Sequence, residues 1–122
     1  MKRPRTRRPT LAGLRRDLRR FAGARDWGQF HTPKNLAMAL SVEAAELLEC
    51  FQWLTPEQSA KLGARDHRAV EEEVADVLLY LLRLTDILDI DPLQAAQRKM
   101  KLNKCKYPVA LARGSARKYS RR

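Results

Sequence analysis

At 122 residues, the chain is long enough for one domain with a modest core and too short for two. Hydrophobic residues make up 44% and charged residues 32%, which is typical of a globular chain and excludes an intrinsically disordered one. The formal net charge of +11 comes from the ends, because residues 1–25 and 97–122 each hold ten Lys/Arg, whereas residues 26–96 hold thirteen acids against five Lys/Arg. The basic character therefore does not describe the central segment, which is acidic.

Composition also bears on the compartment. No run approaches the ~20 apolar residues that a transmembrane helix needs, and the basic N-terminus lacks the apolar segment of a secretory signal. The two cysteines, Cys50 and Cys105, form neither a disulfide framework nor a metal motif. We therefore expect a cytoplasmic protein in a reducing environment, with no membrane partner.

The first predicted elements follow a basic arm. MKRPRTRRP (1–9) has nothing to bury and is predicted to be disordered. An amphipathic helix is predicted over 11–24, where apolar residues recur at steps of three, four and three: Leu11, Leu14, Leu18 and Phe21.

Two helix starts come next. Thr32 can cap a second helix and Pro33 can occupy its first position, and this helix is expected to end at about Cys50 or Phe51. The segment 55–62 begins Thr-Pro-Glu-Gln, which is a capping-box pattern and predicts a short helix.

The longest helix is expected from about His67 to Leu88, after a polar stretch at Gly63–Asp66. Its apolar residues occupy one stripe and other faces as well: Val70, Val74, Val77, Leu78, Leu79, Leu81, Leu82, Leu84 and Leu88. A helix that is apolar nearly all round must be buried on nearly all sides, which the helices of one short chain can hardly achieve. We therefore expect an obligate homodimer or homotetramer.

The last helix is predicted over about 92–105, with Asp91 as its cap and Pro92 at its first position. Strand patterns with alternating Val, Ile or Thr are absent from the sequence. The predicted fold is all-α, an antiparallel bundle of four main helices. Its predicted domain plan is a disordered arm over 1–9, one domain over 10–108 and a basic tail over 109–122.

The stretch VEAAELLE (42–49) places a carboxylate where a leucine would be expected. Leu36, Leu40, Glu43 and Leu47 step by four, three and four, the spacing of a helix face that packs on a core. A carboxylate on such a face is costly unless a cation meets it. The position of Glu43 therefore predicts a positively charged partner.

The longest helix carries an acidic pair of its own. Glu73 and Asp76 are three residues apart and share one side of the helix, as Glu43 and Glu46 do on the second helix. Four carboxylates brought together repel one another unless a hard cation lies between them, and oxygen ligands select Mg²⁺, Mn²⁺ or Ca²⁺ over zinc or copper. No Glu-x-x-His pair is present, which argues against a di-iron site. The pattern favours Mg²⁺, with Mn²⁺ as a substitute; the alternative is that each pair lies on a solvated helix face.

With their flanking segments these acids carry a family resemblance. E-x-x-E followed by E-x-x-D, with RDWGQFHTPKNLAMAL, FQW and KMKLNKCKYP in the same order, resembles the dCTP pyrophosphatase branch of the MazG-like all-α nucleoside triphosphate pyrophosphohydrolases. The resemblance covers about residues 14–108. It implies magnesium-dependent hydrolysis of dCTP or a modified dCTP to the monophosphate and pyrophosphate, as part of nucleotide-pool house-cleaning.

The resemblance also implies roles for the acids. Glu43, Glu46, Glu73 and Asp76 would hold the metal. Glu46 or Glu49 would orient the attacking water, and the sequence leaves that choice open. Glu49 continues the spacing of three and is alternatively a surface residue.

A second set of implied residues would bind the substrate. Those that would enclose the base and sugar are Trp27, His31, Trp53 and Tyr80. Those that would reach the phosphates and the base edge are Lys99, Asn103 and Lys104, the last at a position where relatives often have arginine. The alternatives are core packing for the aromatic residues and solvated charge for the lysines.

Three rival functions stay open. A broad-range or dUTP-type pyrophosphatase would keep the chemistry and change the substrate. A non-enzymatic helical protein could bind nucleic acid nonspecifically through the basic ends at 1–25 and 109–122, although that function gives no reason for four acids beside a core face. A catalytically dead structural oligomer is disfavoured because all four proposed ligands are intact.

Overall fold

The computed structural model describes residues 8–121, and all the regular elements in that range are helical. They form two compact units, one ending at Asp89 and the other beginning at Ile90. The all-α prediction is confirmed. Residues 1–7 of the arm that was predicted to be disordered lie outside the described residues.

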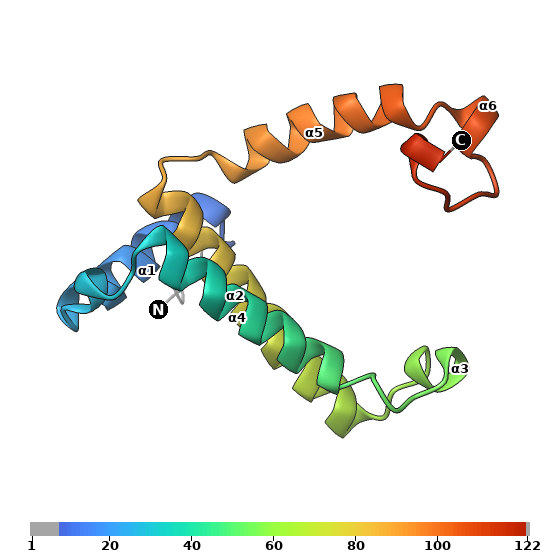
Figure 1. Cartoon of the computed structure of the whole chain (residues 1–122). Coiled ribbons are helices and arrows are strands. Elements are labelled where there is room, and N and C mark those ends of the chain that lie inside the picture. Colours follow the sequence, from blue (N-terminus) through green and yellow to red (C-terminus); the bar gives the residue numbers. More distant parts are fainter. Residues whose placement is uncertain (1–7, 122) are drawn as a thin grey trace, which may run out of the picture. The chain divides into compact units, whose positions relative to one another are not determined.

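The first unit contains five elements: α1 (Leu11–Ala24), the 3-10 helix η1 (Trp27–Gln29), α2 (Pro33–Glu49), α3 (Pro56–Ser59) and α4 (Ala64–Ile87). α2 and α4 run antiparallel and lie side by side, and α1 packs on α4 (Figure 1). The two predicted acidic pairs therefore lie on two helices that pack against each other.

The helix starts follow the predicted capping residues. The Thr32 hydroxyl accepts a hydrogen bond from the Asn35 N–H at 3.1 Å, and Thr55 forms a reciprocal capping box with Gln58. Satisfying the free N–H groups of a first turn stabilises a helix start by about 1 kcal/mol. The predicted starts of α2 and α3 are confirmed.

One helix start differs from the prediction. α4 begins at Ala64, three residues before His67, and Gly63 occupies the N-cap position. The first turn of α4 is polar and exposed, so it carries no apolar periodicity. Asp66 suits this turn because a carboxylate is favourable at a helix N-terminus.

The second unit contains α5 (Pro92–Lys106), α6 (Val109–Ala112) and the 3-10 helix η2 (Tyr119–Arg121). The Asp91 side chain accepts hydrogen bonds from the N–H groups of Leu93 and Gln94, as its predicted capping role requires. The predicted basic tail over 109–122 thus contains two short helical turns. The predicted domain bounds stay a prediction.

The core of the described chain is small. Its fully buried apolar side chains are Ala22, Leu36 and Leu82. Large apolar side chains are exposed along both long helices: Met38, Val42 and Leu48 on α2, and Val74, Leu78 and Leu81 on α4. No helix within residues 8–121 combines the length and apolar character that a membrane span requires.

Candidate active site

The acidic pairs of α2 and α4 meet where the two helices pack. One carboxylate oxygen each of Glu43, Glu73 and Asp76 lies within 4.8 Å of the others. Glu46, one turn along α2 from Glu43, lies near enough for its carboxylate to raise the pKa of both Glu43 and Glu73. The structure therefore brings together the four residues that the spacing singled out.

This carboxylate cluster is electrostatically unfavourable on its own. Burial, a hydrogen bond from Glu46 and the charges of the neighbouring acids raise the pKa of Glu43 to about 7. Burial, with the charges of Glu46 and Asp76, also raises the pKa of Glu73. In the described part of the chain, Oε2 of Glu43 and Oε2 of Glu73 are buried without a hydrogen-bond partner.

Two buried carboxylate oxygens without partners are the donor set that a hard divalent cation takes. Mg²⁺ binds oxygen ligands and usually uses only one or two protein carboxylates, with substrate phosphates and water completing its shell. The residues present therefore fit Mg²⁺. Glu49 lies exposed at the last position of α2 and outside the cluster, so its catalytic role stays a prediction.

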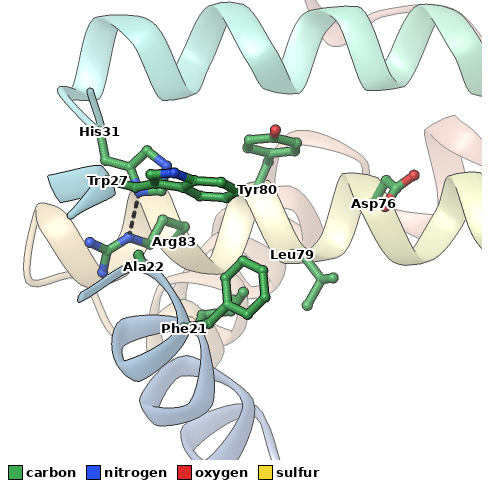
Figure 2. Close-up of a pocket in the computed structure, with 9 residues that line it drawn as sticks. Phe21, Ala22, Trp27, His31, Asp76, Leu79, Tyr80 and Arg83 are labelled. Carbon is green, nitrogen blue, oxygen red and sulfur yellow. Dashed lines mark hydrogen bonds between the residues drawn. The ribbon is translucent and has the colours of Figure 1, made fainter. Parts of the chain in front are cut away.

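A cavity of about 190 Å³ opens beside the cluster. Its walls come from α1, η1, the turn before α2, and α4: Leu18, Phe21, Ala22, Trp27, His31, Asp76, Leu79, Tyr80 and Arg83. Asp76 belongs to both the cavity wall and the carboxylate cluster. Figure 2 shows Asp76 about a turn along α4 from Tyr80, so the two sites share one helix face.

The aromatic wall is built by local structure. Asp26 adopts a left-handed backbone conformation (φ 53°), which asparagine and aspartate tolerate best among non-glycine residues, and so turns the chain from α1 into η1. Trp27 follows this turn and packs edge-on against Phe21 at 5.5 Å and against His31 at 6.2 Å between ring centroids. The predicted pocket residues Trp27, His31 and Tyr80 therefore lie together.

An arginine that was not among the predicted site residues also lines the cavity. Arg83 is only 8% exposed, and its Nε donates a hydrogen bond to Nδ1 of His31 at 3.0 Å (Figure 2). Its Nη1 donates to Oδ2 of Asp86 at 3.3 Å. The available signal was a basic residue between Leu82 and Leu84 in the apolar stretch of α4.

The Asp86 carboxylate joins this arginine to α1. It accepts hydrogen bonds from Arg15 at 3.4 Å and from Nε of Arg19 at 3.0 Å, besides that from Arg83. The hydrogen bond from Arg19 and the charges of the three arginines lower the pKa of Asp86 against the opposing effect of burial. Burial and the nearby charge of Arg83 lower the pKa of His31, which favours a neutral imidazole.

The remaining predicted substrate residues belong to other segments of the chain. Trp53 is 86% exposed in the segment between α2 and α3 and does not line the cavity. Lys99, Asn103 and Lys104 lie on α5 in the second unit, with Asn103 half-buried and both lysines exposed. The substrate roles of these four residues stay predictions.

The chain is similar to several known proteins. The model of the MazG-like family matches residues 38–121. The chain is 45% identical over 114 residues to dCTP pyrophosphatase 1 from Homo sapiens, covering 92% of this chain and 67% of that protein. The same protein from Bos taurus is also 45% identical, with 92% and 68% covered. A pyrophosphatase of known structure from Archaeoglobus fulgidus is 44% identical, with a TM-score of 0.77 over 87% of this chain and 99% of that one.

Proposed function

The chain belongs to the MazG-like family, and we propose that it is a Mg²⁺-dependent pyrophosphohydrolase that converts dCTP, or a modified dCTP, to the monophosphate and pyrophosphate. The observation that carries the proposal is the carboxylate cluster with its buried, unpartnered oxygens of Glu43 and Glu73, directly beside an aromatic cavity. A triphosphate cannot approach such a cluster without a cation to invert the local charge. The similarity to dCTP pyrophosphatase 1 supports the choice of base.

The metal ligands in this proposal are Glu43, Glu46, Glu73 and Asp76. When bound, Mg²⁺ supplies charge neutralisation at the phosphates and lowers the pKa of a coordinated water. Mn²⁺ is the expected substitute because it takes the same oxygen ligands.

Glu46 is the better of the two proposed residues for orienting the attacking water. It lies beside Glu43 and Glu73 in the cluster, whereas Glu49 is exposed one turn further along α2. A group that orients water must be within hydrogen-bond reach of it. We therefore assign this role to Glu46 and leave Glu49 at the surface.

The cavity holds the nucleoside end of the substrate in this proposal. Pockets that enclose a whole drug-sized ligand usually measure about 300–1,000 Å³, so a cavity of about 190 Å³ accommodates a base and not an entire nucleotide. Trp27 and Tyr80 offer ring faces to a flat base. Asp76 then lies between the base and the phosphates, because it borders the cavity and belongs to the cluster.

We propose that the working form is a homodimer or homotetramer in the cytoplasm. The small core and the exposed apolar side chains of α2 and α4 support this assembly, since large exposed apolar patches mark interaction surfaces. A second copy would also provide cover for Trp53, which its own chain leaves exposed. Nonspecific nucleic-acid binding through the basic ends would be a separate property of the tails.

Pyrophosphate release from a panel of canonical and modified nucleoside triphosphates, with and without Mg²⁺, tests the proposal. Glu73→Gln is the inactivating variant. Glu71→Gln is its matched control, because Glu71 is exposed on the same helix and pairs with His67. Release from dCTP-like substrates that is lost in Glu73→Gln alone supports the proposal. Release from all bases alike refutes the dCTP assignment, and no release from any nucleotide refutes the activity.

A further inference from the structure

Arg83 is a buried cation that the proposed hydrolysis does not use. It lies beside the aromatic cavity, and its side chain is 10% exposed. We propose that Arg83 is a positioning residue that holds His31 as the Nε2–H tautomer, so that His31 presents one fixed N–H donor to an acceptor atom of the bound nucleoside. The identity of the ligand as a nucleoside rests on the proposed function. The tautomer of His31 rests on the geometry alone.

The hydrogen bond decides the tautomer. A guanidinium has five N–H donors and no acceptor, so the atom facing its Nε must be an acceptor. Nε of Arg83 lies 3.0 Å from Nδ1 of His31, which is an ordinary N–H···N distance. Nδ1 must therefore carry the lone pair, and in a neutral imidazole the single proton is then on Nε2.

The surroundings also disfavour the doubly protonated ring. Protonation of Nδ1 would place an N–H against the N–H of Arg83 and two positive charges side by side. Burial and the charge of Arg83 lower the pKa of His31 accordingly. His31 thus offers a neutral donor, which suits a carbonyl oxygen or a ring nitrogen of a base better than it suits a phosphate.

Arg83 can impose this arrangement because it is itself held in place. Nη1 donates to Asp86, whose side chain is 7% exposed and also accepts from Arg15 and Arg19 of α1. The edge-on contact with Trp27 restrains the plane of the His31 ring. Among residues 8–121, Nε2 of His31 has no hydrogen-bond partner, so it is the ring atom left for a ligand in the cavity.

The tautomer is measurable without any nucleotide. The chain contains two histidines, and two-bond ¹H–¹⁵N NMR of the imidazole rings distinguishes protonated from unprotonated ring nitrogens. His31 is expected to be protonated at Nε2 only. His67 is the internal control with the opposite behaviour at Nδ1, which should be protonated because it lies 3.1 Å from a carboxylate oxygen of Glu71. The His67→Asn variant assigns the two signals and leaves the cavity unchanged.

Variants then test whether Arg83 acts through His31. In Arg83→Met, which keeps the side-chain length and removes the donors, His31 is expected to show both tautomers. His31→Phe removes the donor, so the KM for dCTP is expected to rise about 3–10-fold, the worth of one hydrogen bond, with kcat changed less. Arg83→Met should raise the KM by a smaller factor, because the fraction of His31 with Nε2 protonated still donates, and the double variant should show the rise of His31→Phe alone. Arg83→Lys, which keeps a donor and the charge, should recover part of the loss.

The results separate this inference from the proposed function. A wild-type His31 protonated at Nδ1 overturns the positioning role even if dCTP is hydrolysed. Additive effects of Arg83→Met and His31→Phe overturn it as well. The tautomer is observed in the wild-type protein without nucleotide. The positioning role of Arg83 can therefore be tested even if the protein does not hydrolyse dCTP. The wild-type measurement also stands if Arg83→Met fails to fold.

Discussion

The Asp86 carboxylate is expected to make the strongest electrostatic contribution to the packing of α1 on α4. Its side chain is 7% exposed and accepts hydrogen bonds from Arg83, Arg15 and Arg19. Asp86→Ala removes the shared acceptor and leaves the guanidinium of Arg83, 10% exposed, without a counter-charge. Breaking a buried ion pair by removing one partner costs about 3–5 kcal/mol. For a chain of this length such a loss corresponds to a fall in Tm of roughly 10–20 °C.

Thermal unfolding followed by circular dichroism, at one fixed protein concentration, tests this magnitude. Arg19→Ala is the matched control. It removes a partner that is 62% exposed and therefore screened by water, so a small effect is expected. A loss from Asp86→Ala no larger than that from Arg19→Ala would refute the reasoning. The lowered pKa of Asp86 adds a second readout. The wild type should lose this stabilisation as the pH falls below about 4, and Asp86→Ala should not.

Three further outcomes are expected. Glu73→Gln should abolish the rise in Tm that Mg²⁺ produces, measured by calorimetry with and without the ion; an unchanged rise would exclude Glu73 as a ligand. Because the pKa of Glu43 is raised to about 7, the folded metal-free protein binds more protons than the unfolded chain between about pH 4.5 and 7. Its stability should therefore fall as the pH rises through that window, and urea unfolding should show a smaller slope in Glu43→Gln, where the raised pKa of Glu73 still contributes. Trp27→Ala should raise the KM for dCTP several-fold by removing a cavity wall, whereas Trp53→Ala should change the KM less, because Trp53 is exposed and does not line the cavity.

The helices could be predicted well because their signals are local. Thr32 and Thr55 each precede a proline, and both make the predicted cap. The start of α4 was predicted three residues late because its first turn is exposed on all sides and has no apolar period. The two turns within the tail, such as α6 (Val109–Ala112), are too short for periodicity to show.

The carboxylate cluster could also be predicted, since acids three apart on one helix must share a face. The spacing of residues along one helix could not predict which side chains of other elements they contact. His31 and Arg83 are 52 positions apart, and only the packing of α4 beside the turn before α2 brings them together. Trp53 shows the converse, because its side chain is 86% exposed and does not line the cavity, so its predicted role stays a prediction.

The residues that conflict with their local surroundings lie around one site. Glu43 occupies a position on a core-facing stripe where an apolar residue is expected. Glu73 has a buried oxygen with no hydrogen-bond partner, and Arg83 interrupts the apolar face of α4. Natural chains tolerate such conflicts mainly at functional sites, where stability is given up for chemistry. Here the first two conflicts would be relieved by a cation and the third is relieved by Asp86. Asp76 belongs to the carboxylate cluster and also lines the cavity, so these two parts of the site are adjacent. A nucleotide that places its base against Trp27 would thereby direct its phosphates toward the carboxylates.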